Sequence, residues 1–322
     1  MGCRRNTRRG VEGVAPWGGA WLPALLGLGG LVGGLALMTW GLRQATRGQV
    51  RQAVAALRRA GPLQALVAGC LLTALLQSSS TFGLLLVGAV AAGWVSLPVA
   101  RAAIVGANIG TTVTAHLTAT PAPALAWTLA AAGLGLAAAG RRQPRWRAVG
   151  LAAIGLGAAL TGLDQLGRAL APLAARGTGS APWTHLPGHP WLAFGTGLVA
   201  AAGALSSGAV IAVVQRGVSA GLLPASAALP VVYGANVGTT SDVLLAGLLL
   251  RGPALSVAWF HLGLNAATAV VAFCLSPLLA AAAAALAADP ARQVAWAHTL
   301  FNLLSALLAW PWLDEPGPRR PH

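Results

Sequence analysis

Two kinds of polar run interrupt the long apolar stretches of the chain, and both carry side chains that could hold ions. The first reads Gln77-Ser78-Ser79-Ser80-Thr81. Its four consecutive hydroxyls are more than one face of a helix can hold, so the run favours a break in the helix. Backbone N–H groups at the start of the next helix would then face an anion, and oxyanions such as phosphate fit this arrangement. The alternative is that these serines bond back to carbonyls four residues earlier and only pack.

The second kind, Gly-Ala-Asn-Ile-Gly-Thr-Thr at 106–112, offers oxygens rather than N–H donors. Its glycines predict an unwound helix with exposed carbonyls, to which Asn108, Thr111 and Thr112 add side-chain oxygens. An oxygen-rich, weakly charged shell suits a hard monovalent cation such as sodium. Close packing of glycine-rich helices is the alternative.

Both runs recur 128 residues later without a gap. The copies are Ser206-Ser207 and Gly-Ala-Asn-Val-Gly-Thr-Thr at 234–240, which supplies Asn236, Thr239 and Thr240. Polar clusters are costly in hydrocarbon unless they line a wet or ligand-filled cavity. A duplicated unit that carries two such clusters is typical of a transporter rather than of a channel or an enzyme.

The elements that must position these runs are predicted to be membrane helices. Of the 322 residues, 56% are hydrophobic and only 8% are charged, which a soluble domain could not bury. Apolar runs near the ~20 residues that span hydrocarbon indicate an all-α, polytopic membrane protein. These runs are 17–42, 62–95, 123–140, 148–163, 192–215, 227–250, 253–287 and 293–312.

The net charge of +15 comes from arginines in short clusters between the apolar runs. No stripe of aromatic and basic residues accompanies them, so we expect no nucleic-acid partner and interpret the clusters as topology signals. The three cysteines have neither a disulfide framework nor metal-ligand spacing.

Six parts of the chain follow from these patterns. They are an Arg-rich tail (1–16), a first span with an amphipathic segment (17–61), repeat 1 (62–140), an Arg cluster with a span and an exposed connector (141–191), repeat 2 (192–287), and a last span with its tail (288–322). The amphipathic segment, which includes Arg43, is expected to lie along the membrane surface.

The arginine clusters suggest that the two repeats have opposite orientations. If each serine run tips a re-entrant hairpin, the cluster at 141–147 and the C-terminus are cytoplasmic, and the connector at 176–190 lies outside. Repeat 1 then starts inside and repeat 2 outside, an inverted arrangement that gives secondary transporters one site at the membrane midplane. The arginines at 4–9 fit only if 17–42 is broken into a hairpin near Pro23 or if the start codon is misassigned.

Other polar residues leave alternatives open. Asp242 is the only carboxylate within the repeated motifs, and it could neutralise a cation, carry a proton or lie at a helix end in water. His261 and His298 each precede an asparagine, Asn265 and Asn302, by one helical turn. For both pairs an interhelical hydrogen bond is favoured over substrate binding.

These motifs, together with Thr73–Gln77 and Ala297–Asn302, resemble the type II sodium-dependent phosphate cotransporters and their bacterial relatives over about residues 25–312. The resemblance implies two inverted repeats with serine-tipped hairpins, inorganic phosphate as substrate, sodium as coupling ion, and ligands from both serine runs. Leu205 and Gly208 stand where the family has a second glutamine and a last serine, which weakens the second half of the expected site.

The first hypothesis is therefore sodium-coupled phosphate uptake across the plasma membrane by alternating access, without an enzymatic activity or a further cofactor. The alternatives are a proton-coupled or other-oxyanion carrier that uses Asp242, and a degenerate homologue that no longer transports. A hydrolase built from Ser79, a histidine and Asp242 is disfavoured, because the serine lacks a Gly-x-Ser-x-Gly setting.

Overall fold

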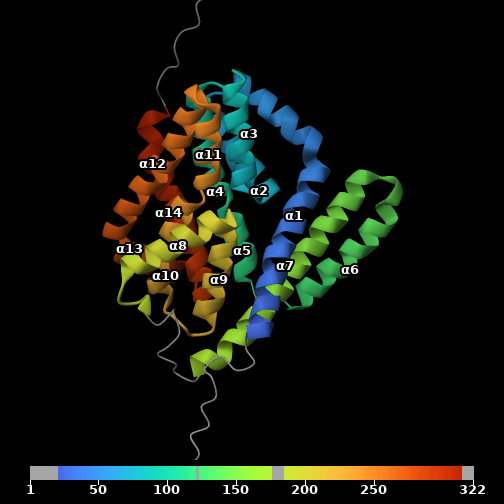
Figure 1. Cartoon of the computed structure of the whole chain (residues 1–322), viewed down its shortest axis with the longest axis vertical. Coiled ribbons are helices and arrows are strands. Elements are labelled where there is room, and N and C mark those ends of the chain that lie inside the picture. The colour runs from blue at the N-terminus through green and yellow to red at the C-terminus, as the bar shows by residue number, and fades with distance from the viewer. Residues whose placement is uncertain (1–20, 121–122, 176–184, 314–322) are drawn as a thin grey trace, which may run out of the picture.

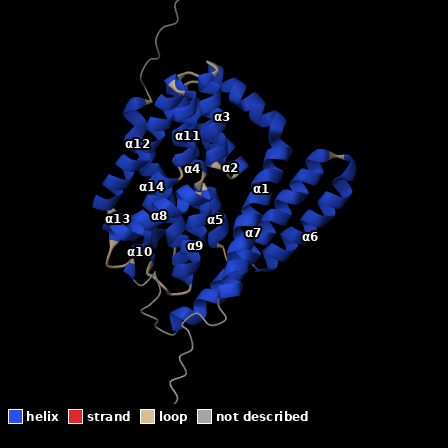
Figure 2. Ribbon diagram, viewed as in Figure 1, coloured by secondary structure: helices blue, strands red, loops and turns tan. Residues whose placement is uncertain are grey.

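The computed structural model describes residues 21–120, 123–175 and 185–313, and every regular element in these ranges is a helix (Figure 2). The predicted all-α class is confirmed for this part of the chain. Among the described residues, five helical stretches are long and apolar enough to cross a membrane, which makes the protein a multi-pass membrane protein. They are Trp21–Arg59, Pro123–Arg142, Pro144–Pro172, Gly252–Cys274 and Pro290–Trp312.

Three long helices form one side of the molecule (Figure 1). Helix α1 (Trp21–Ala56) packs along α7 (Pro144–Ala175), and α6 (Pro123–Ala139) packs on the other side of α7. Short 3-10 turns, Leu57–Arg59 and Gly140–Arg142, follow α1 and α6. The contact between α1 and α7 is close because small residues face each other: a Cβ at Gly41 would lie 2.6 Å from the Ala148 carbonyl oxygen.

The duplicated unit folds into the same helices twice. Repeat 1 contains α2 (Pro62–Leu76), α3 (Ser79–Ala91), α4 (Leu97–Gly110) and α5 (Thr112–Ala119). Repeat 2 contains α8 (Pro190–Ala204), α9 (Ser207–Ser219), α10 (Ala225–Gly238) and α11 (Ser241–Leu250). The first three helices of each repeat begin and end at residues 128 positions apart, so the sequence repeat is also a structural repeat.

Glycines explain why the two repeats pack alike. A Cβ at Gly106 would overlap the carbonyl oxygen of Leu66, and a Cβ at Gly234 would overlap that of Phe194. These contacts join α4 to α2 and α10 to α8. The backbones approach so closely that only glycine fits at either position.

The last helix of each repeat crosses to the other repeat. Helix α5 packs against α9, and α11 packs against α3. Helices α12 (Gly252–Cys274), α13 (Ser276–Leu286) and α14 (Pro290–Ala309, followed by the turn Trp310–Trp312) complete the bundle. Helix α14 contacts α4, α5, α9 and α10, and it therefore joins the two halves.

The structure corrects two expectations about the N-terminal span. Helix α1 runs unbroken from Trp21 to Ala56, so a hairpin near Pro23 is wrong. The proline is tolerated because it lies in the first turn, where its missing N–H has no helical partner to lose. Arg43 also belongs to this helix instead of a separate segment along the membrane surface. The arginines at 4–9 and the connector from 176 to 184 lie outside the described residues.

Candidate functional site

Both serine runs break a helix in the same way. Gln77 ends α2 with φ 52° and ψ 31°, and Leu205 ends α8 with φ 50° and ψ 32°. Left-handed backbone at a non-glycine residue costs roughly 1 kcal/mol or more, and such residues concentrate at functional sites. The serine that follows each break has extended backbone, with φ −157° at Ser78 and −158° at Ser206. The predicted helix breaks are therefore confirmed at both copies.

The serines cap the helices that follow. The Ser78 hydroxyl oxygen accepts a hydrogen bond from the Thr81 N–H, and that of Ser206 accepts one from the Ala209 N–H, each at 3.2 Å. One N–H of the first turn is thereby satisfied, while the remaining donors of α3 and α9 keep the positive end of each helix dipole.

The two breaks meet at one cavity. The Ser80 hydroxyl donates a hydrogen bond to the Leu205 carbonyl oxygen at 3.2 Å, which brings the tip of the α2–α3 pair against the tip of the α8–α9 pair. Figure 1 shows these pairs in opposite halves of the molecule. A cavity of about 390 Å³ lies beside their contact. Its lining comprises Val32, Leu35, Ala36, Thr39, Trp40, Arg43, Gln77, Ser78, Ser79, Ser80, Thr111, Thr114, Ala204, Leu205, Ser206, Ser207, Gly208 and Ala209.

Helix α1 supplies one wall of this cavity, which the sequence analysis did not expect. Its lining residues run from Val32 to Arg43 at helical spacing, so they share one face of the helix. Arg43 is the only charged residue among the described residues that line the cavity, and its guanidinium donates to the Thr81 hydroxyl. The helical spacing of the α1 residues from Val32 to Arg43 is the sequence signal that could have placed Arg43 at the site.

Asp242 lies at the tip of the first helix pair, although it belongs to the second repeat. Its carboxylate lies near the Ser80 side chain and accepts a hydrogen bond from the Val243 N–H at 2.7 Å. The residue is half-buried in the first turn of α11. Asp242 thus lies at a helix end, as one of the expected alternatives had it, and is half-buried there.

The equivalent position in the other half is filled by Thr114, which the sequence analysis missed. Thr114 stands 128 residues before Asp242, and Gly208 stands 128 after Ser80. A Cβ on Gly208 would lie 3.1 Å from the Thr114 methyl carbon, so the two pairs of positions make equivalent contacts across the repeats. Thr114 donates to the Gln77 side-chain oxygen at 3.0 Å, and this bond orients the amide at the cavity.

The two repeated asparagines do not line the cavity. Each is buried and pairs with a histidine from a C-terminal helix: Asn108 with His261 at 3.0 Å and Asn236 with His298 at 3.2 Å. Asn265 and Asn302 donate to the carbonyls of these histidines within their own helices. The expected interhelical hydrogen bonds are confirmed, and the repeated asparagines are their partners.

The threonines of the second motif bond back to their own helix. Thr111, Thr112, Thr239 and Thr240 each donate to a carbonyl three or four residues earlier, at 2.6 to 2.8 Å, and only Thr111 also lines the cavity. Helices α4 and α10 continue through both glycines of the motif. The expected unwinding is thus wrong there, because the glycines serve close packing instead; the helix ends only at the threonines.

Comparisons with known proteins agree with this architecture. Residues 31–168 and 174–304 match the Na+/Pi-cotransporter family. A Bacillus subtilis relative, "Uncharacterized protein YqeW", is 29% identical over 253 residues, which is 78% of this chain and 81% of the relative. No solved structure gives a significant match. Since the family match covers most of the chain and includes both helix breaks, the protein belongs to the Na+/Pi-cotransporter family.

Proposed function

We propose that the protein is a secondary carrier that moves inorganic phosphate across the plasma membrane together with sodium. The observation that carries this proposal is the meeting of two serine-capped helix starts, one from each repeat, at a single cavity. Family membership supports phosphate as the substrate. The cavity of about 390 Å³ is larger than a small oxyanion with a few water molecules requires.

Phosphate would bind at the serine breaks. The helix starts of α3 and α9 direct free N–H groups and partial positive charge into the cavity, which favours an oxyanion. Ser79 lines the cavity next to Ser80, and Ser207 is its counterpart from the second repeat. Leu205, 52% exposed, replaces an amide at this lining, so the second half contributes fewer donors than the first.

Sodium would bind next to phosphate at the contact between the repeats. Asp242 is a carboxylate held beside Ser80, and hydroxyl and carboxylate oxygens are suitable ligands for a hard cation. The remaining motif residues are buried, and we assign them the role of holding the helix ends in place. They are Asn108, Thr112, Asn236, Thr239 and Thr240.

An alternating-access mechanism agrees with the internal repeat. The two helix pairs extend from opposite halves of the molecule toward the same contact, and this supports the proposal of inverted repeats with re-entrant hairpins. Rocking of one repeat against the other would open the cavity to one side of the membrane at a time. Apolar helices of 10–17 residues, such as Pro62–Leu76 and Pro190–Ala204, support this reading because they are shorter than a span.

Proton coupling is the second candidate, and the position of Asp242 favours it. A half-buried carboxylate at the contact between two moving halves can take up and release a proton during each cycle. In that case a pH gradient alone would drive uptake.

Uptake of labelled phosphate into proteoliposomes tests the proposal, with sodium and proton gradients imposed separately. We expect uptake that requires the sodium gradient and that falls at least about tenfold in Ser79→Ala, as expected for loss of one hydrogen bond to a charged ligand. Ser96→Ala is the matched control, because Ser96 is exposed and caps its helix without a side-chain bond. Equal uptake without sodium would refute the coupling, and no uptake under either gradient would support a homologue that has lost transport.

Neither histidine is arranged for serine hydrolysis. Among the described hydrogen bonds, His261 and His298 pair with asparagines, and neither pairs with a serine. The family match also favours transport over catalysis.

A further inference from the structure

Arg43 reaches the cavity from a helix that lies outside both repeats. Helix α1 precedes the duplicated unit and packs along α7. Gly34 and Gly41 approach the α7 backbone too closely to accept a side chain without a shift. These contacts lie in the turns of α1 before Arg43 and fix the position from which its side chain extends.

The charge of Arg43 has no counter-ion among the described residues. No described carboxylate forms an ion pair with it, and its one side-chain partner is the neutral hydroxyl of Thr81. A guanidinium carries five N–H donors, so most of them stay available to a ligand. An ionised side chain within a membrane helix is costly and usually faces a cavity or a partner of opposite charge.

The neighbouring Arg47 does not share the position of Arg43 at the cavity. Arg47 is one turn further along the same helix; both arginines are exposed, but only Arg43 lines the cavity. Arg43 therefore combines three properties: a helix position fixed by α7, a cavity lined by hydroxyls, and an unneutralised positive charge.

From these observations we infer that Arg43 binds the transported oxyanion directly and supplies the one full positive charge of the site. This inference rests on the proposed function. The planar guanidinium can donate two parallel hydrogen bonds to a phosphate, which an ammonium group cannot reproduce. Without a bound anion, Thr81 holds the guanidinium at the cavity; when phosphate binds, the free donors turn to its oxygens. The anion is then held by three parts of the molecule, namely both helix breaks and α1.

The test compares Arg43→Gln and Arg43→Lys with the wild type, and Arg47→Gln is the matched control. We expect Arg43→Gln to raise the KM for phosphate by about tenfold or more with a smaller change in kcat, because charge-assisted hydrogen bonds are lost. Arg43→Lys keeps the charge but loses the paired donors. Its KM for phosphate is expected to lie between that of the wild type and that of Arg43→Gln. Arg47→Gln is expected to leave KM unchanged.

A charge-restoration experiment separates binding from a structural role. Arg43→Cys is made in a protein whose native cysteines are replaced by serine, and it is then treated with a cationic or an anionic thiol reagent of similar size. We expect the cationic reagent to lower KM again and the anionic reagent to leave it high. Equal effects of both reagents, or a wild-type KM in Arg43→Gln, would overturn the inference.

Binding of inorganic phosphate to the detergent-solubilised protein, measured by calorimetry, keeps the two proposals apart. Wild-type protein that binds phosphate but does not transport it would contradict the proposed function alone. Weaker binding in Arg43→Gln than in Arg47→Gln would still support the role of Arg43. Equal binding by the wild type and Arg43→Gln, or no binding by either, would reject that role whatever the uptake assay shows.

Discussion

At the scale of single residues, Asp242 is the side chain that we propose for coupling transport to an ion. It belongs to the second repeat but lies near Ser80 at the tip of the first helix pair. Its counterpart Thr114 is neutral, so the two halves of the site differ in charge at equivalent positions. One carboxylate is thus available at the contact between the halves, and its charge can attract a sodium ion or hold a proton.

Replacement of this carboxylate distinguishes the two ions. If sodium binds there, Asp242→Asn is expected to raise the sodium concentration for half-maximal phosphate uptake by about tenfold, which corresponds to ~1.4 kcal/mol. Asp164→Asn is the control, because Asp164 forms an exposed ion pair with Arg168 at 2.7 Å and surface pairs contribute little. The proton would instead be identified as the coupling ion by two results together: wild-type uptake that does not depend on sodium, and loss of the response to a pH gradient in Asp242→Asn.

The buried histidine–asparagine pairs have a structural role that a second experiment can measure. Asn236→Leu leaves the His298 ring nitrogen without its partner in a buried place, which is expected to cost about 1–3 kcal/mol of stability. The double variant Asn236→Leu/His298→Leu removes both polar groups and is expected to be more stable than Asn236→Leu alone. Thermal unfolding in detergent measures both. If the single and double variants lose stability additively, the hydrogen bond between these side chains does not hold α10 to α14.

At the scale of elements, glycines determine how each repeat packs. Gly106→Ala is expected to destabilise the fold by about 1–3 kcal/mol or more, because the new methyl group would overlap the Leu66 carbonyl oxygen and force α4 away from α2. Gly135→Ala is the control, since a Cβ there meets no atom within 4 Å. The yield of monodisperse protein and its unfolding temperature report the difference. Equal values for the two variants would show that α2 and α4 can separate without cost.

The same elements show what the sequence could predict. The repeat predicted both helix breaks, because four consecutive hydroxyls disfavour a continuous helix and two of these serines recur at a constant offset. It did not predict that Gly106 and Gly110 pack against α2, since a glycine suits an unwound turn and a close helix contact equally well. The choice between an unwound turn and a close helix contact depends on which helix packs against the glycines, and the sequence alone does not identify that helix.

Helix α1 and the contacts across the repeats were harder to predict for a related reason. The arginines from Arg43 onward are typical of a segment at the membrane surface, so the sequence predicted a separate surface segment there. The structure has one unbroken helix of 36 residues instead. The packing of α1 on α7 places one of these arginines at the cavity, and that contact joins parts of the chain more than one hundred residues apart. The pairing of Asp242 with Ser80 depends in the same way on α11 crossing to the other repeat.

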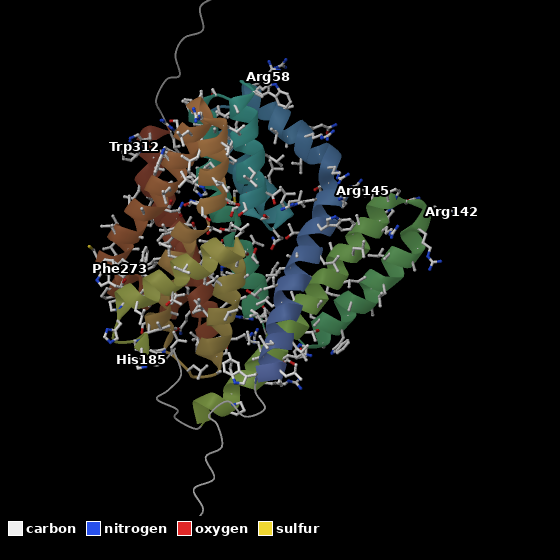
Figure 3. All side chains as sticks on the ribbon, viewed as in Figure 1. Arg58, Arg142, Arg145, His185, Phe273 and Trp312 are labelled. Atoms are coloured by element: carbon white, nitrogen blue, oxygen red, sulfur yellow. The ribbon has the colours of Figure 1, made fainter. Side chains whose placement is uncertain are left out.

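At the scale of the whole molecule, the ends of the bundle indicate how it is oriented in the membrane. Figure 3 shows Arg58 and Trp312 toward one end and His185 toward the other. Trp312 thus lies at the same end as Arg58, which the distribution of arginine predicts to be cytoplasmic, and His185 lies at the opposite end, which it predicts to be outside. In that orientation we expect the turn after α3 to face the cytoplasm and the equivalent turn after α9 to face outward.

Cysteine labelling in intact cells tests this opposite orientation. Single cysteines are introduced at Ser96, before α4, and at Ser226, in the first turn of α10, in a protein without native cysteines; both serines are exposed. A membrane-impermeant maleimide added outside is expected to label Ser226→Cys and to label Ser96→Cys only after permeabilisation. His185→Cys and Arg142→Cys mark the outer and inner sides. Labelling of both test positions from one side would mean that the repeats are parallel. If two parallel repeats exchanged their conformations, the shared cavity would still open to the same face of the membrane, so this form of alternating access would be excluded.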